Sequence, residues 1–442
     1  MARAAAALTA QRAAVLLSGL MMVGCASFGE GVGRAVLSQL NAEPGEDLRA
    51  CEIKGAAFDG IEGALAAQNS QARIGAADSG QRSVVKIITV HGVGPHHPGY
   101  SGRTVANLTA TLGLNVVSPQ IKSIELADPA FPGESLGTLT AQRFTDEQLQ
   151  RELIVYELTW SRISDHARDM LRFDSSEIHT RHRATLNQLG KAFVNDRLVD
   201  PLVYVGVGRG RILNAVRQGI CWAYSTDWYD FPTSSTSCGM DDPGFGSRLP
   251  LDRYYFVTHS LGSRIVLDAL ETSAAELYAQ LDQASGKTPF MASLQNQTMT
   301  VFMLSNQLPL LQAGFPPVPV SGQIAAYCGP DSPLRERRIV ARTEVIAFSD
   351  PNDLLSYPIP DDFVQHGIDS RLCPRVVNVT LNIAHVIRVG GAKAFANPET
   401  AHSAYNDDSR VIGLMAGGLG RPESSQEVSE RCNWLRVDEA LR

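Results

Sequence analysis

A series of apolar, β-branched runs separated by helix-length segments constrains the fold of this chain more than any other feature. The first run, at residues 84–90, is largely apolar without alternation, which is typical of a strand buried on both faces of a parallel sheet. Comparable runs follow at 153–158, 254–258, 299–304, 344–348 and 376–383. Their spacing leaves room for crossover helices. We therefore predict an α/β chain with a mostly parallel central sheet and helices on both faces.

Residues 165–250 interrupt this alternation, because no comparable strand run occurs there. Apolar residues instead recur at helical spacing in three segments, at 165–171, 184–195 and 212–223. We expect a helical cap inserted at about 165–250 over the carboxyl edge of the sheet. The rest of the chain divides into a leader at 1–24, a poorly patterned extension at 25–81, a main domain at 82–430 and a tail at 431–442.

The charge balance argues against a nucleic-acid partner. The formal net charge is −7 over 442 residues and no long Lys/Arg run occurs, so the basic surface that a nucleic-acid binder needs is missing. Hydrophobic residues make up 44% of the chain, which is enough for a sizeable core.

The N-terminus has the order of a secretory signal: two arginines, an apolar run at 13–23, and small residues. Met22-Val23-Gly24-Cys25 resembles the lipobox of bacterial lipoproteins. The resemblance implies that Cys25 is acylated and anchors the mature chain to the cell envelope, and Ala26 favours the periplasmic face of the outer membrane. An ordinary cleaved signal with an incidental cysteine is the alternative.

The other six cysteines are an even set, as expected for disulfides in an oxidising compartment: Cys51, Cys221, Cys238, Cys328, Cys373 and Cys432. Cys221 and Cys238 bracket a turn-rich stretch, so their pairing would close a short loop. Cys328 would then pair with Cys373, and Cys51 with Cys432. Six cysteines allow 15 connectivities, and buried free thiols are the alternative. None has the CxxC spacing of a structural zinc site.

A nucleophile elbow is predicted at residues 254–267, where a β-run, a sharp turn and a helix follow one another with Ser260 at the turn. Thr258-His259-Ser260-Leu261-Gly262 resembles the GxSxG motif of the α/β-hydrolase superfamily, with Thr258 in place of the first glycine. The resemblance implies an α/β-hydrolase fold and assigns Ser260 as the nucleophile.

The loop His91-Gly92-Val93-Gly94-Pro95 resembles the HG-type oxyanion loop of lipases and esterases. By that resemblance, the backbone N–H groups of Val93 and Leu261 would bind the oxyanion. A glycine turn is one alternative interpretation. A metal site formed by His91, His96 and His97 is another, although no nearby carboxylate completes it.

The predicted strand at 344–348 leads into a turn whose pattern resembles the acid turn of the same superfamily, with Asp353 in the acid's place. Asp350 is the competing residue. The base must follow in the order Ser, Asp, His, and His385 and His402 both qualify. His402 lies in a turn-like stretch from which an imidazole can reach the serine, so we prefer it to His385, which lies close to the last strand.

Taken together, the resemblance implies a serine hydrolase of the esterase or lipase type that cleaves an acyl ester or lipid through Ser260, Asp353 and His402, with no metal or organic cofactor. Two alternatives stay open. The chain could be a non-catalytic envelope lipoprotein that uses the scaffold for binding, or an acyltransferase or thioesterase.

Overall fold

The computed structural model describes residues 50–75, 83–117, 121–148, 150–242, 244–283, 289–389 and 393–437. The predicted leader and Cys25 lie outside these residues. Within them, no helix combines the length and the apolar character needed to cross a membrane.

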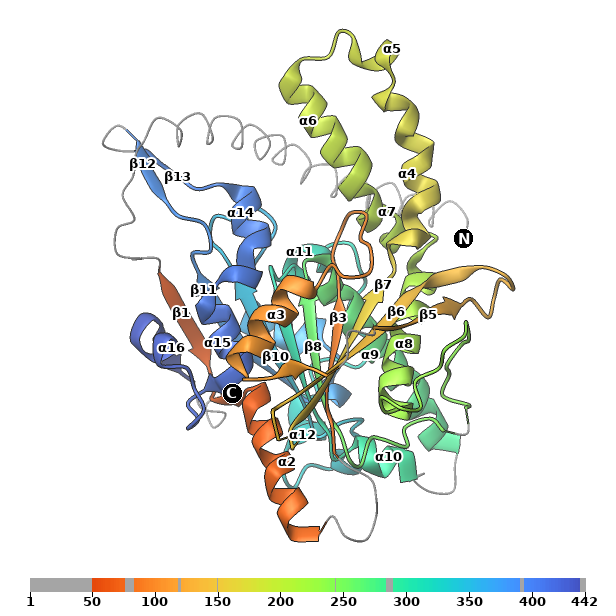
Figure 1. Cartoon of the computed structure of the whole chain (residues 1–442), viewed down its shortest axis with the longest axis vertical. Helices are drawn as coiled ribbons and strands as arrows, with labels where there is room; N and C mark the ends of the chain where they lie inside the picture. Colours follow the sequence, from red (N-terminus) through yellow and green to blue (C-terminus); the bar gives the residue numbers. More distant parts are fainter. Residues whose placement is uncertain are drawn as a thin grey trace.

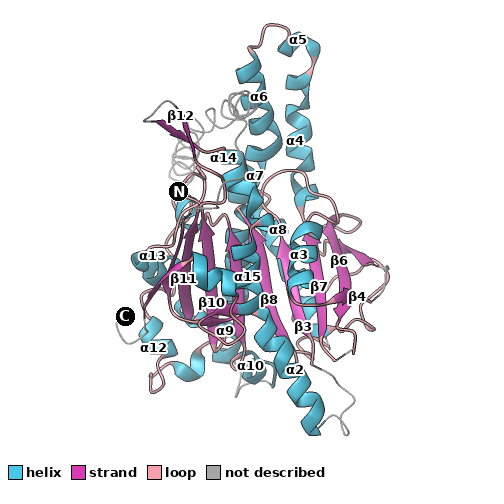
Figure 2. Ribbon diagram, turned by 60° about the vertical axis from the view of Figure 1, so that its left-hand side comes forward, coloured by secondary structure: helices cyan, strands magenta, loops and turns pink. Residues whose placement is uncertain are grey.

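An 11-stranded, mostly parallel sheet forms the centre of the molecule (Figures 1 and 2). All six predicted strand runs form neighbouring parallel strands: β7 (Glu152–Thr159), β3 (Val85–Val90), β8 (Arg253–His259), β9 (Thr298–Leu304), β10 (Arg342–Ser349) and β11 (Pro374–Leu381). Antiparallel strands β6 (Ser135–Thr145), β5 (Lys122–Ala127) and β4 (Asn115–Val116) extend the sheet beyond β7. The fold class is therefore mixed α/β, as the strand runs predict.

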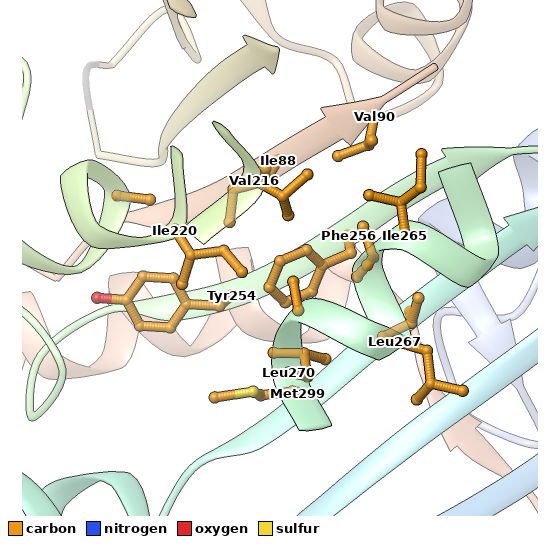
Figure 3. Packing of buried hydrophobic residues seen from close by; sticks show 14 of the residues in the cluster. Ile88, Val90, Val216, Ile220, Tyr254, Phe256, Ile265, Leu267, Leu270 and Met299 are labelled. Carbon is orange, nitrogen blue, oxygen red and sulfur yellow. The ribbon is translucent and has the colours of Figure 1, made fainter. Parts of the chain in front are cut away.

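Helices cover both faces of the sheet because alternate strand residues point to opposite sides. Ile88, Tyr254 and Phe256 pack on one face against α8 (Arg209–Ser225) and α9 (Leu261–Gln283) (Figure 3). Their neighbours Ile87 and Tyr255 face the second core. That core is covered by α2 (Ile61–Gly75), α3 (Gly102–Thr111) and α15 (Ser409–Gly417). Each central strand is thus buried on both sides, which explains its continuous apolar run.

The predicted extension at 25–81 and the tail at 431–442 are corrected by the structure in their described parts. Strand β1 (Cys51–Gly55) pairs antiparallel with β11, and β15 (Asn433–Arg436) pairs parallel with β1. Both ends of the described chain therefore belong to the main sheet. The alternating burial of β1 and the exposure of much of β15 give weaker sequence patterns than the central strands do.

The predicted cap is shorter than 165–250. Helices α4 (Asp165–Leu171), α5 (Glu177–Thr180) and α6 (Thr185–Phe193) form a helical hairpin that rises from the body (Figure 1). A π-helical turn, Val194–Leu198, and α7 (Val199–Val205) join it to the carboxyl edge of the sheet. Helix α8 is instead part of a core layer, because Ile212, Val216 and Ile220 form a buried stripe one turn apart.

The six cysteines form three disulfides, Cys51–Cys432, Cys221–Cys238 and Cys328–Cys373. The first ties the described N-terminal strand to the C-terminal end of the sheet. The Cys221–Cys238 bond joins α8 to the loop that follows it, so it restrains that loop rather than the helical hairpin. The Cα atoms of this pair are 5.8 Å apart, within the range of ordinary disulfides.

Candidate active site

Ser260 lies at a strained turn between β8 and α9. Its φ of 55° is in the left-handed region, and its N–H donates to the carbonyl of Leu304 at 2.9 Å. Two glycines, Gly262 in this turn and Gly92 in the loop after β3, allow the two segments to approach each other closely. A Cβ on Gly262 would lie 2.4 Å from the Val90 carbonyl oxygen, and one on Gly92 would lie 2.7 Å from the Ser260 Cβ. The spacing of small residues in the sequence therefore has a steric cause.

Thr258 occupies the place of the first glycine of the motif without displacing the turn. Its hydroxyl donates to the Phe302 carbonyl at 3.2 Å and lies 3.1 Å from the Ser263 hydroxyl. The side chain is buried but its polar atom has partners, so the larger residue is accommodated beneath the serine.

His402 and Asp353 complete a chain of contacts that begins at Ser260. The Ser260 hydroxyl lies 3.2 Å from His402 Nε2, and His402 Nδ1 lies 2.9 Å from both carboxylate oxygens of Asp353. His402 lies in α14 (Pro398–Ser403), whose first turn is capped by the Asn397 side chain. Asp353 follows β10 in a turn in which its N–H donates to the Asp350 carbonyl at 3.0 Å.

The two competing residues lie elsewhere in the contact network. The Asp350 carboxylate accepts hydrogen bonds from the backbone N–H groups of Ile383 and Ala384, at 2.6 and 3.0 Å, and from Asn352. It joins two loops at the carboxyl edge of the sheet. His385 is exposed after β11. The structure therefore brings Asp353 and His402 to Ser260.

Ser305 is a further member of this network that the sequence analysis missed. It follows β9 with a φ of 52°, and its hydroxyl donates to Asp353 Oδ2 at 2.7 Å and lies 2.8 Å from His402 Nδ1. The residue is fully buried. Its place at the carboxyl end of a predicted strand was the available signal, because the ends of parallel strands share one edge of the sheet.

The loop after β3 is held from both sides. His91 stacks against Trp160, donates through Nδ1 to the Gly92 carbonyl, and accepts at Nε2 from the backbone N–H of Trp160. Both ring nitrogens are thus engaged in protein contacts. The Gly94 N–H donates to the buried carboxylate of Asp200 in α7 at 2.5 Å, and Arg168 of the helical hairpin donates to the other oxygen at 2.6 Å. Asp200 was also missed, since nothing local links it to residue 94.

The predicted oxyanion donors lie beside the serine. Val93 follows Gly92, which packs against Ser260. Val93 and Ser260 line the same pocket. Leu261 is the first residue of α9, and the N–H groups of a first helical turn lack helical partners. The pocket has a volume of about 200 Å³ and is formed by the loop after β3, the start of α3, the π-helical turn, and the ends of β8 and α14.

Burial and hydrogen bonds set the charges at the site. Burial acts to raise the pKa of Asp353, but hydrogen bonds from His402, the Leu355 amide and the Ser305 hydroxyl outweigh it, so the pKa is lowered. Burial, reinforced by the neighbouring His402, lowers the pKa of His259 to about 3. The neutral His259 ring donates through Nε2 to the backbone carbonyl of His402 at 2.9 Å. This hydrogen bond helps to fix the backbone position of His402.

Among the residues that the structure describes, one group of His, Cys, Asp and Glu donors comes together closely enough to hold a metal, and it comprises Cys221, Cys238 and Asp242. Its two cysteines are joined in a disulfide. The histidines of the loop after β3 are not part of such a group.

Comparison with protein-family models, curated proteins and solved structures finds no match for this chain.

Proposed function

We propose that this protein is a serine hydrolase that cleaves an acyl ester through an acyl-enzyme. The observation that carries the proposal is the continuous contact from the Ser260 hydroxyl through His402 to a buried Asp353. A serine, a base that can take its proton and a carboxylate that orients the base are the groups that acyl transfer needs.

In the proposed first step, the Ser260 oxygen attacks the acyl carbon while His402 Nε2 takes the hydroxyl proton. The bond from the acyl carbon to the leaving oxygen then breaks, and His402 gives its proton to the leaving alcohol. Water repeats the sequence on the acyl-enzyme and releases the acid. Asp353 keeps the imidazole proton on Nδ1 and stabilises the charged ring.

Two backbone N–H groups are proposed to stabilise the oxyanion, those of Val93 and Leu261. Losing one donor of an oxyanion hole typically costs about 3–4 kcal/mol of transition-state stabilisation, so the position of the loop matters. The contact between Gly94 and Asp200 supports this role, because it fixes the residue next to Val93.

The sheet is consistent with the α/β-hydrolase fold that the motif implies. Ser260 follows β8, Asp353 follows β10, and His402 lies in α14, beyond β11 and the pair formed by β12 (Ile387–Val389) and β13 (Lys393–Phe395). This is the chain order of nucleophile, acid and base in that superfamily. We propose that fold for this chain on the strength of this order together with the elbow.

The proposed substrate is a lipid or other acyl ester, which the protein would meet at a membrane surface. The helical hairpin carries exposed Met170, Phe173 and Ile178, and its helix α5 lies at the outer end of the hairpin, away from the sheet (Figure 2). Exposed apolar groups of this kind favour contact with an apolar surface. The proposed lipid anchor at Cys25 would hold the domain at the cell envelope, where such a surface is available.

Labelling with a fluorophosphonate tests the proposal directly. The purified chain should be labelled at Ser260, and Ser260→Ala should abolish both labelling and ester turnover. Ser293→Ala, which changes a half-buried serine in α10 (Pro289–Leu294), is the matched control and should behave like the wild type. Labelling that persists in Ser260→Ala would overturn the assignment.

The choice of base has its own test. His402→Ala should lower kcat by several orders of magnitude, as the loss of a triad member does, whereas His385→Ala should not. Equal effects of the two substitutions would contradict the proposed mechanism.

A further inference from the structure

The pocket around Ser260 is lined by positively charged and neutral groups. Its lining includes His91, His96, His259 and His402 together with one arginine, Arg197. Among the described residues that line it, none is an aspartate or a glutamate. Asp353 lies behind His402 and is engaged there. A second buried carboxylate, Glu157, lies behind Ser101, whose amide and hydroxyl donate to it. With an arginine and no carboxylate in its lining, the pocket favours an anionic substrate over a cationic one.

The positive charge in the lining of this pocket comes from Arg197 rather than from His91, His96 or His259. Burial lowers the pKa of His91, His96 and His259, so these three rings are neutral near pH 7. The arginine is charged at any physiological pH.

Arg197 is placed over the loop after β3 by the π-helical turn Val194–Leu198. A Cβ built on Gly94 would lie 3.7 Å from Arg197 Cγ, so the stem of the side chain passes close to this loop. The residue lines the pocket beside the seryl and histidyl groups of the site. π-Helical turns are rare and occur frequently at functional sites.

Arg197 differs from the other cations of the hairpin region. Each of these has an ion-pair partner: Arg162 with Glu125, Arg168 with Asp165 and Asp200, Arg172 with Asp169, Arg181 with Glu177, and Arg183 and Lys191 with Asp174. Within the described part of the chain, the side chain of Arg197 has no hydrogen-bond or ion-pair partner. The nearest buried carboxylate along the chain, Asp200, is already occupied by Gly94 and Arg168.

We infer that Arg197 binds an anionic group of the substrate, so the preferred substrate is an acyl ester that carries a carboxylate or a phosphate close to the scissile carbonyl. This inference rests on the proposed hydrolase function and names its substrate class. A guanidinium suits both groups because its planar N–H donors can form two parallel hydrogen bonds to two oxygens.

Two matched pairs of esters test the inference and distinguish the two anions. The 4-nitrophenyl monoester of glutaric acid and 4-nitrophenyl pentanoate have the same chain length and differ by one carboxylate. A 1-acylglycerol 3-phosphate and the corresponding monoacylglycerol differ by one phosphate. For each ester, kcat/KM is measured with the wild type, Arg197→Gln, Arg197→Lys and the control Arg181→Gln, which changes an exposed, paired arginine of the same hairpin.

The wild type should prefer the anionic member of at least one pair. Arg197→Gln should lower kcat/KM for that member by about tenfold, which is within the range that hydrogen bonds to charged groups supply, and leave the neutral member within about twofold. Arg197→Lys should retain part of the preference, because it keeps the charge and loses the paired donors. The preference should weaken at high salt. Arg181→Gln should keep the wild-type preference.

The failures of the inference and of the proposed function are distinguishable. If neutral esters are cleaved and Ser260 is labelled, but neither pair shows an anion preference, the substrate class is wrong and the hydrolase function stands. The same holds if Arg197→Gln weakens both members of a pair equally, since that indicates a packing role. If the wild type neither cleaves any of the esters nor is labelled, the proposed function itself is overturned, and the inference with it.

Discussion

The Ser305 hydroxyl should contribute to turnover without contributing to substrate binding. It donates to Asp353 Oδ2 at 2.7 Å and lies 2.8 Å from His402 Nδ1, and the carboxylate that it contacts is almost completely buried. Ser305 is not among the residues that line the pocket. Ser305→Ala therefore removes a hydrogen bond that helps to hold the acid and the base in line.

The magnitude follows from the charge of the partner. A hydrogen bond to a charged group contributes about 1.5–3 kcal/mol, and each 1.4 kcal/mol corresponds to a factor of ten. Ser305→Ala should thus lower kcat by about ten- to a hundredfold and leave KM close to the wild-type value. The loss should be well below the effect of removing a triad member, because Asp353 keeps its contacts with His402 and the Leu355 amide.

Two further variants separate the hydroxyl from the backbone. Ser305 has a φ of 52°, which glycine adopts readily, so Ser305→Gly removes the hydroxyl and relieves backbone strain, whereas Ser305→Ala keeps the strain. Both should lower kcat alike, although Ser305→Gly should be the more stable of the two in urea. Ser356→Ala, which removes a buried hydroxyl bonded to the Asp350 N–H, is the control and should leave kcat unchanged. A kcat for Ser305→Ala within twofold of the wild type would refute the argument.

Three other predictions concern the loop, the pH dependence and the disulfides. Asp200→Asn should slow fluorophosphonate labelling by about tenfold, because the Gly94 N–H and its loop lose a charged acceptor, and an unchanged labelling rate would contradict this. Unfolded His259 titrates near 6.5 but its folded pKa is about 3, so between these values the unfolded state binds the extra proton and stability falls as the pH falls. His259→Gln should flatten that part of the stability curve measured by urea unfolding, and an identical slope would exclude His259 as its source. Cys51→Ser should lower the free energy of unfolding by up to about 5 kcal/mol, since the bond closes most of the chain; an unchanged urea midpoint would show that the sheet pairing alone holds β1.

Local sequence patterns were enough to locate the strands that have an apolar environment on both faces. The six central strands are buried on both faces, so each reads as a continuous apolar run that needs no knowledge of its neighbours. The edge strands were missed for the opposite reason: β1 alternates between buried and exposed residues, and β15 is short and mostly exposed. Helix α8 was recognised as a helix but misplaced, because an apolar stripe shows that a helix is amphipathic without showing which surface covers it.

The same division applies to the candidate site. A strand, a turn and a helix within fourteen residues place Ser260 at the turn whatever the rest of the chain does. The resemblance of a later turn to the superfamily's acid turn was enough to propose Asp353, and the superfamily's chain order with a turn-like location was enough to prefer His402. The distinction between Asp353 and Asp350 needed the tertiary structure, since both carboxylates lie in one short turn and only their distant partners differ.

The tertiary structure alone determined that three further side chains lie at the site, those of Ser305, Asp200 and Arg197. The Asp200 carboxylate meets Gly94 across 106 residues of sequence, and the Ser305 hydroxyl meets His402 across 97. No local pattern records such a contact, because it depends on where the sheet places the ends of separate strands and where the hairpin returns to the body. The sequence by itself therefore determined the strands and the turn that expose the serine, and the packing of distant segments determined which polar groups surround it.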